Sequence, residues 1–80
     1  MTTDAVAKLV AMANQIATAF EGQHGDAVAD TADHIRMFWP RLMRDSIVRH
    51  LASGGEGLSP TARAAVGEMA ASHPAVGPPA

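Results

Sequence analysis

The chain has 80 residues, of which 48% are hydrophobic, and it carries a formal net charge of −2 and no cysteine. This composition is typical of a globular domain and excludes a wholly disordered chain. The lack of cysteine excludes disulfides, thiolate zinc sites, iron–sulfur ligation and a cysteine nucleophile in this chain.

The first predicted element is a helix that begins near Thr3 and ends before a loop at residues 21–26. Thr3 and Asp4 suit a helix start, because a hydroxyl caps free amides and an early carboxylate favours the helix dipole. Two glycines within the sequence EGQHGD indicate the loop. Between these ends, apolar residues recur at spacings of three and four and share one helix face: Val6, Leu9, Ala13, Ile16 and Phe20.

A second helix is predicted after Asp26 or Asp30, either of which would cap it. Pro40 then predicts a break or sharp kink at Trp39 and Pro40, because proline disfavours helical geometry in the residue before it and lacks an amide hydrogen. A third helix should follow through about Ala52. The apolar stripe of the second helix is Val28, Ala32, Ile35 and Trp39, and that of the third is Pro40, Met43, Ile47 and Leu51.

Gly54 and Gly55 predict the end of the third helix. Ser59 as cap and Pro60 as first helical residue predict the start of a fourth, with an apolar face of Ala62, Val66 and Met69. Residues 72–80 contain three prolines, which indicates a disordered tail. We therefore expect an all-α fold, a small bundle of three to four short helices in a single helical domain over residues 1–71, followed by a disordered tail at 72–80.

The predicted core is thin, because 17 of the 80 residues are alanines that bury little area. Domains of this size rarely gain more than about 3–5 kcal/mol from one core and usually need a staple or a partner. Without cysteine, a partner chain is the expected source of extra stability. Neither a signal peptide nor a membrane-spanning run is recognisable, so the chain is expected to be cytoplasmic and to bind no membrane.

Catalytic, cofactor-binding and metal-binding residues are not assigned. Asp30 and His34 have a ligand-like spacing of four on a helix, but no second pair supports a metal site, and a surface hydrogen bond or ion pair explains them better. The chain has no phosphate-binding glycine motif, and no serine lies in a GxSxG elbow. We therefore expect that this chain is not an enzyme by itself.

The stretch HIRMFWPRLMR, residues 34–44, concentrates two of the three aromatic residues and three of the arginines. Residues 34–50 have a formal charge of +3, against −4 for residues 1–33. Because Trp, Phe, Met and Arg are enriched in interface cores, we interpret this region as a protein interface and expect Phe38 to close the core. The partner-binding candidates are Arg36, Trp39, Arg41, Met43, Arg44 and Arg49.

Three alternatives stay open for this basic region. The first alternative is an ordinary solvated helix face. The second is a nucleic-acid-binding surface in a standalone helical regulator. The acidic sequence pI near 6.0 makes nucleic acid unlikely. A self-complementary surface in a homodimeric helical bundle is the third alternative.

Several short motifs together resemble a known family: MANQI at 12–16, ADHI at 32–35, FW at 38–39, MR at 43–44, His50, GG at 54–55 and GLSP at 57–60. In this set and spacing, the chain resembles the delta subunit of the cytoplasmic NAD-dependent, molybdenum-containing formate dehydrogenase. The resemblance covers about residues 6–70.

The resemblance implies a non-catalytic accessory subunit of a formate dehydrogenase complex, in which other subunits oxidise formate. The partner would be the alpha subunit, which in this family carries bis-molybdopterin guanine dinucleotide and iron–sulfur clusters, with FMN and NAD handled by the beta and gamma subunits. The delta subunit would bind the alpha subunit and support cofactor loading, assembly or stability of the complex. No cofactor would be bound by this chain.

Overall fold

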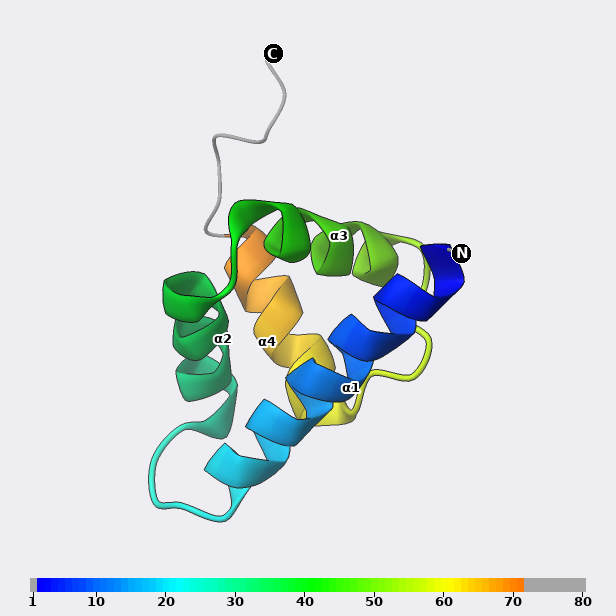
Figure 1. Cartoon of the computed structure of the whole chain (residues 1–80). Coiled ribbons are helices and arrows are strands. Elements are labelled where there is room, and N and C mark those ends of the chain that lie inside the picture. The colour runs from blue at the N-terminus through cyan, green and yellow to red at the C-terminus, as the bar shows by residue number, and fades with distance from the viewer. Residues whose placement is uncertain (1, 72–80) are drawn as a thin grey trace.

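A computed structural model of the chain describes residues 2–71, with side chains described from Ala5 onward. Within this range the chain forms four helices and no strand (Figure 1). This result confirms the predicted all-α fold, whereas the predicted disordered tail at 72–80 lies outside the described residues. The helices are α1 (Thr2–Glu21), α2 (Ala27–Phe38), α3 (Arg41–Ala52) and α4 (Pro60–Ala71).

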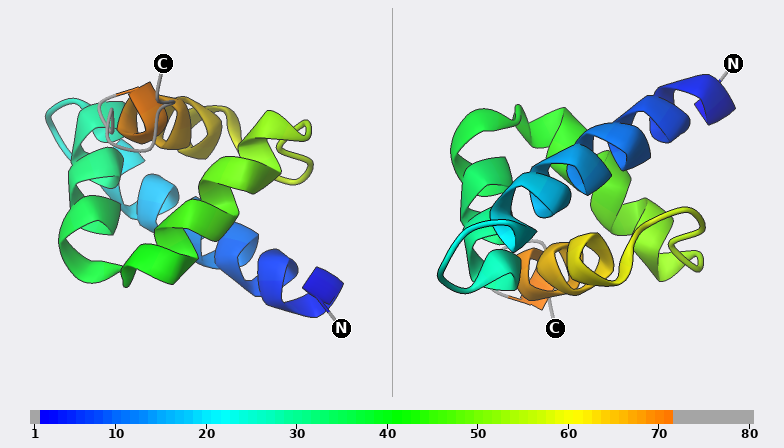
Figure 2. Two further views of the ribbon diagram at one scale, coloured as in Figure 1. Left: turned by 90° about the horizontal axis from the view of Figure 1, so that it is seen from above. Right: turned by 90° about the horizontal axis from the view of Figure 1, so that it is seen from below.

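The four helices pack as a small cluster in which α1 and α4 each contact all the other helices. The most extensive packing is between α2 and α4, which are far apart in the sequence. In contrast, α2 and α3 are consecutive in the chain but meet mainly at the corner that joins them, where the chain turns sharply (Figures 1 and 2). The two sides of this corner are therefore held through α1 and α4 more than through each other.

The core lies where the four helices meet, and alanine makes up a large part of it. Ile35, Ile47 and Val66 are the largest apolar side chains that are fully buried. Five alanines are also fully buried, which lets the helix backbones approach closely but contributes little apolar area per residue. These alanines are Ala13, Ala17, Ala32, Ala62 and Ala65. The structure thus confirms that the core is built from few large side chains.

The starts of α2 and α4 are fixed by the residues that the sequence predicted. The Asp26 carboxylate accepts hydrogen bonds from the amides of Val28 and Ala29, each at 3.1 Å. At α4, the Ser59 hydroxyl oxygen accepts a hydrogen bond from the Ala62 amide at 3.2 Å, and Pro60 is the first helical residue. Each cap satisfies amides that have no partner within the helix, so both boundaries follow from local sequence.

Two glycines end α3 in the manner of a Schellman motif. The Gly54 amide donates to the Leu51 carbonyl at 3.0 Å, and the Gly55 amide donates to the His50 carbonyl at 2.8 Å. Gly54 has φ 126° and Gly55 has φ 64°, backbone angles that residues other than glycine rarely adopt. The helix therefore stops where the sequence predicted.

Side chains from α3 and α4 then hold the loop between these two helices. The Arg63 guanidinium donates to the carbonyls of Gly54 and Gly55, each at 3.0 Å. The His50 ring nitrogen Nε2 lies 2.8 Å from the Glu56 carbonyl oxygen. The loop is thus attached to the helices on both sides of it.

The amide side chain of Asn14 joins α1 to the start of α4. Its Nδ2 donates to the Gly57 carbonyl at 2.9 Å, and its Oδ1 accepts from the Ser59 amide at 2.9 Å. We expect Asn14→Ala to lower the free energy of unfolding by about 2 kcal/mol, because the partly buried Ser59 amide loses its acceptor. Urea denaturation followed by circular dichroism measures this, with the exposed neighbour Gln15→Ala as control. Equal stability of the two variants would contradict the assigned role of Asn14.

Candidate partner-binding surface

The predicted interface region lies at the corner between α2 and α3. Trp39 is extended, with φ −90° and ψ 138°, and Pro40 follows with φ −63° and ψ 154°. The Trp39 amide still donates to the Ile35 carbonyl at 3.0 Å, which completes the last turn of α2. The predicted break is confirmed, because the residue before a proline favours this extended conformation. Pro40 itself is exposed and precedes α3, so the prediction that it lines the apolar face of the third helix is wrong.

The two aromatic side chains at this corner point the opposite way from the prediction. Trp39 is only 6% exposed and belongs to the core, whereas Phe38 is 66% exposed. Trp39 comes four residues after the fully buried Ile35 and therefore continues the buried stripe of α2, while Phe38 is rotated about 100° away from it. The prediction that Phe38 closes the core is wrong, and Trp39, which was predicted to face a partner, is buried within this chain.

The exposed Phe38 ring packs against other rings on its own surface. Its centroid lies 4.7 Å from that of the His34 ring, one turn earlier in α2. On the other side, His34 contacts Phe20 of α1 edge to face, with centroids 6.1 Å apart. This row of three rings supports Phe38 from one side and leaves the rest of the ring exposed.

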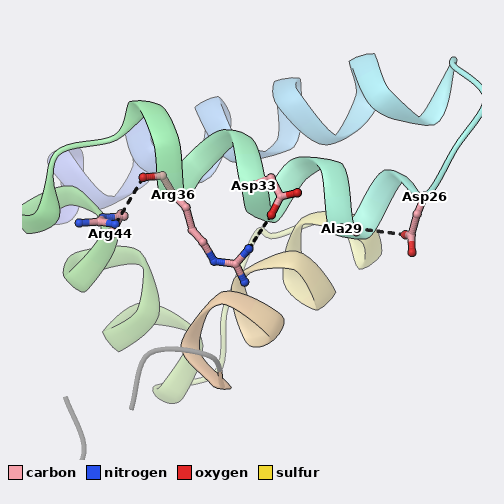
Figure 3. Close-up of polar contacts among 5 residues, drawn as sticks. All are labelled: Asp26, Ala29, Asp33, Arg36 and Arg44. Atoms are coloured by element: carbon pink, nitrogen blue, oxygen red, sulfur yellow. Dashed lines mark hydrogen bonds and ion pairs between the residues drawn. The ribbon is translucent and has the colours of Figure 1, made fainter. Parts of the chain in front are cut away.

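Two of the predicted arginines make contacts within the chain (Figure 3). The Arg36 guanidinium forms an ion pair with Asp33 at 2.6 Å. Arg44 reaches back from α3, and its Nη1 donates a long hydrogen bond of 3.4 Å to the Arg36 carbonyl oxygen. That bond crosses the corner and links the last turn of α2 to the first turns of α3. Both side chains are partly buried, so they support the shape of the corner.

Arg41 and Arg49 are the exposed members of the predicted set. Arg41 Nε lies 3.8 Å from Asp45 Oδ2, and this pair is one turn apart on the surface of α3. Such an exposed pair contributes little stability. Because the Arg41 side chain is exposed, its guanidinium is accessible to a carboxylate of another chain. Met43 is partly buried against the core. The predicted set is therefore divided: Trp39, Met43, Arg36 and Arg44 face inward to different degrees, and only Arg41 and Arg49 face outward.

The predicted partner-binding set did not include the three most exposed large apolar side chains among those that the structure describes. Met37 is 73% exposed and Leu42 is 80% exposed, and they flank the corner together with Phe38. We call Met37, Phe38 and Leu42 the apolar corner. Their positions around each helix could have identified them in the sequence. Met37 and Phe38 fall outside the apolar stripe of α2 through Ile35, and Leu42 falls outside that of α3 through Ile47.

The described residues offer no group of three His, Cys, Asp or Glu side chains placed to hold a metal ion. They therefore do not fit the metal-containing groups that the resemblance implies for the complex, and we derive no chemistry of such groups from this chain. In addition, none of the helices within residues 2–71 has the length and apolar character needed to cross a membrane.

Comparison with known protein families gives one match that spans most of the helical chain. A family model described as "NADH-dependant formate dehydrogenase delta subunit FdsD" matches residues 8–66, from the first half of α1 to the middle of α4. Comparisons with curated proteins and with solved structures gave no match. The family match confirms the resemblance found in the sequence motifs. The chain belongs to the family of NADH-dependent formate dehydrogenase delta subunits.

Proposed function

We propose that this chain is a non-catalytic subunit that binds the molybdenum-bearing alpha subunit of a cytoplasmic NAD-dependent formate dehydrogenase and supports its cofactor loading, assembly or stability. The observation that carries this proposal is the family match over residues 8–66. Formate oxidation would take place on the alpha subunit, with flavin and NAD bound by the beta and gamma subunits, and this chain would bind none of these cofactors.

The structure supports a role in binding. Most of the buried side chains are alanines or other apolar residues, and the core is small for a chain that must persist alone. A partner that binds only the folded chain would add to its stability by mass action. At the same time, a corner of large apolar side chains is left in solvent, as is common at protein-binding surfaces.

The nucleic-acid alternative is weakened by the positions of the arginines. Arg36 pairs with Asp33, and Arg44 bonds to a backbone carbonyl within the chain. That leaves Arg41 and Arg49 as the exposed arginines of this region, and Arg41 already lies near Asp45. Two such groups would neutralise few phosphates, whereas stable nucleic-acid binding usually rests on many more. No observation on the described residues favours this function.

Co-expression of the formate dehydrogenase subunits with and without this chain tests the proposal. We expect the tagged chain to purify with the alpha subunit in a fixed ratio. Enzyme made without it should show a several-fold loss in molybdenum per alpha subunit, in recovered complex, or in half-life during thermal inactivation. These readouts distinguish loading, assembly and stability, in that order. Failure of the tagged chain to retain the alpha subunit would contradict the proposal, as would an enzyme unaffected in all readouts.

A further inference from the structure

The apolar corner is the largest feature of the surface that the packing of the chain does not explain. Its three side chains lie within one turn on either side of the extended residues Trp39 and Pro40. Elsewhere among the described side chains, Met12 is the one other large apolar residue classed as exposed, at 38%. Single exposed apolar residues are normal on protein surfaces, whereas apolar patches made of several large side chains are often functional.

We infer that the apolar corner is the anchor by which this chain docks into an apolar groove with an acidic rim on the larger subunit. This inference rests on the proposed function, because the partner is the one assigned there. The corner is exposed in the chain alone. Its Phe and Met are residue types enriched at interfaces, and its Leu adds apolar area that burial would remove from water.

The charges around the apolar corner determine the chemistry of the rim. Residues 34–50 carry a formal charge of +3 from four arginines and Asp45, and one of these arginines, Arg36, pairs with Asp33 just before this range. Arg41 directly precedes Leu42 and is exposed, and Arg49 is exposed two turns further along α3. Carboxylates on the rim of the groove would complement these two guanidinium groups and steer the approach of the chain.

A second copy of the chain fits this surface less well than a larger partner does. The three side chains expose roughly 400 Å² in total, about half of what each partner contributes to a standard interface. A symmetric dimer formed through the corner would also bring two basic surfaces together. A groove on a larger chain can surround the three side chains and cover the flanking parts of α2 and α3 as well.

Contacts within the chain hold the apolar corner in one shape before it binds. Phe38 packs against His34, and Pro40 fixes the backbone between the two helices. On the inner side, Arg44 donates to the Arg36 carbonyl across the corner. Less conformational freedom is therefore lost on docking than for three side chains on a flexible loop. Arg44 therefore supports the corner from the inside, and the apolar side chains make the contact.

The test uses the full-length chain and the alpha subunit, with binding measured by surface plasmon resonance and by co-purification of the complex. The triple variant Met37→Ala, Phe38→Ala and Leu42→Ala should bind at least about 100-fold more weakly than the wild-type chain. The matched control is Met12→Ala, which removes an exposed methionine on α1 and should bind like wild type. Circular dichroism should show that both variants remain folded, because the three corner side chains are mostly exposed and Met12 is partly exposed.

A second arm tests the acidic rim with the double variant Arg41→Ala and Arg49→Ala. Its association rate should fall and should depend less on salt than that of the wild-type chain. Unchanged association would contradict the acidic rim. Full binding by the folded triple variant would overturn the anchor, as would equal weakening by Met12→Ala. So would a wild-type dimer, seen by analytical ultracentrifugation, that the triple substitution dissociates. If the wild-type chain itself fails to bind the alpha subunit, the proposed function fails first.

Discussion

Replacing Trp39 with alanine is expected to lower the free energy of unfolding by about 3–5 kcal/mol. The indole is almost fully buried at the end of α2, so its removal leaves a cavity beneath the corner. A domain of this size rarely has more than about 3–5 kcal/mol from its core, so the variant should be largely unfolded at 25 °C. Circular dichroism in increasing urea measures the loss.

The matched control is the next residue along the chain. Phe38→Ala removes an aromatic ring of similar size but should change stability by no more than about 1 kcal/mol, because Phe38 is mostly exposed. If the two variants lost equal stability, the orientation of the corner described above would be wrong. A loss of partner binding in Trp39→Ala would follow from loss of folding, so this variant cannot report on the interface.

Replacing Ala65 with leucine is expected to lower the free energy of unfolding by about 3 kcal/mol, through a different mechanism. Ala65 is fully buried in α4. Native interiors are packed to the density of organic crystals, so three additional carbon atoms must push the helices apart. The thin, alanine-rich core is therefore sensitive to larger side chains as well as to smaller ones.

The adjacent residue provides the comparison for this second effect. Ala64 is exposed, about 100° around α4 from Ala65, and Ala64→Leu introduces the same atoms at a site with similar helix preference. We expect its free energy of unfolding to lie within about 0.5 kcal/mol of the wild-type value. Thermal and urea unfolding of the pair measure the difference. A stable Ala65→Leu protein would show that the helices have room to separate, contrary to the packing described here.

The helix boundaries could be predicted because each depends on a few consecutive residues. Asp26 supplies an oxygen for the first amides of α2, and Ser59 with Pro60 does the same for α4. Gly54 and Gly55 adopt backbone angles that end a helix. In contrast, the link from Asn14 to Gly57 and Ser59 joins residues 43 to 45 positions apart, and no local pattern indicates it. Such contacts depend on how the helices pack.

Only part of the surface was predicted correctly, because two sequence arguments disagreed about Trp39. Its spacing from Ile35 placed it on the buried stripe of the second helix, and this argument was correct. The frequency of tryptophan at interfaces favoured exposure and was misleading at this site. The inward role of Arg44 depends on the angle between α2 and α3 at Pro40, which the sequence does not determine. The Arg36–Asp33 pair instead lies within one turn of α2 and does not depend on that angle.

The burial of Trp39 also provides the chain with its own optical probe. Trp39 is the single tryptophan of the sequence, and it lies in the core directly under the corner. Its fluorescence should be shifted to shorter wavelength and protected from acrylamide quenching while the helices are packed. Opening of the junction between α2 and α3 would therefore appear as a red shift in the isolated chain, even when the helix content measured by circular dichroism is unchanged.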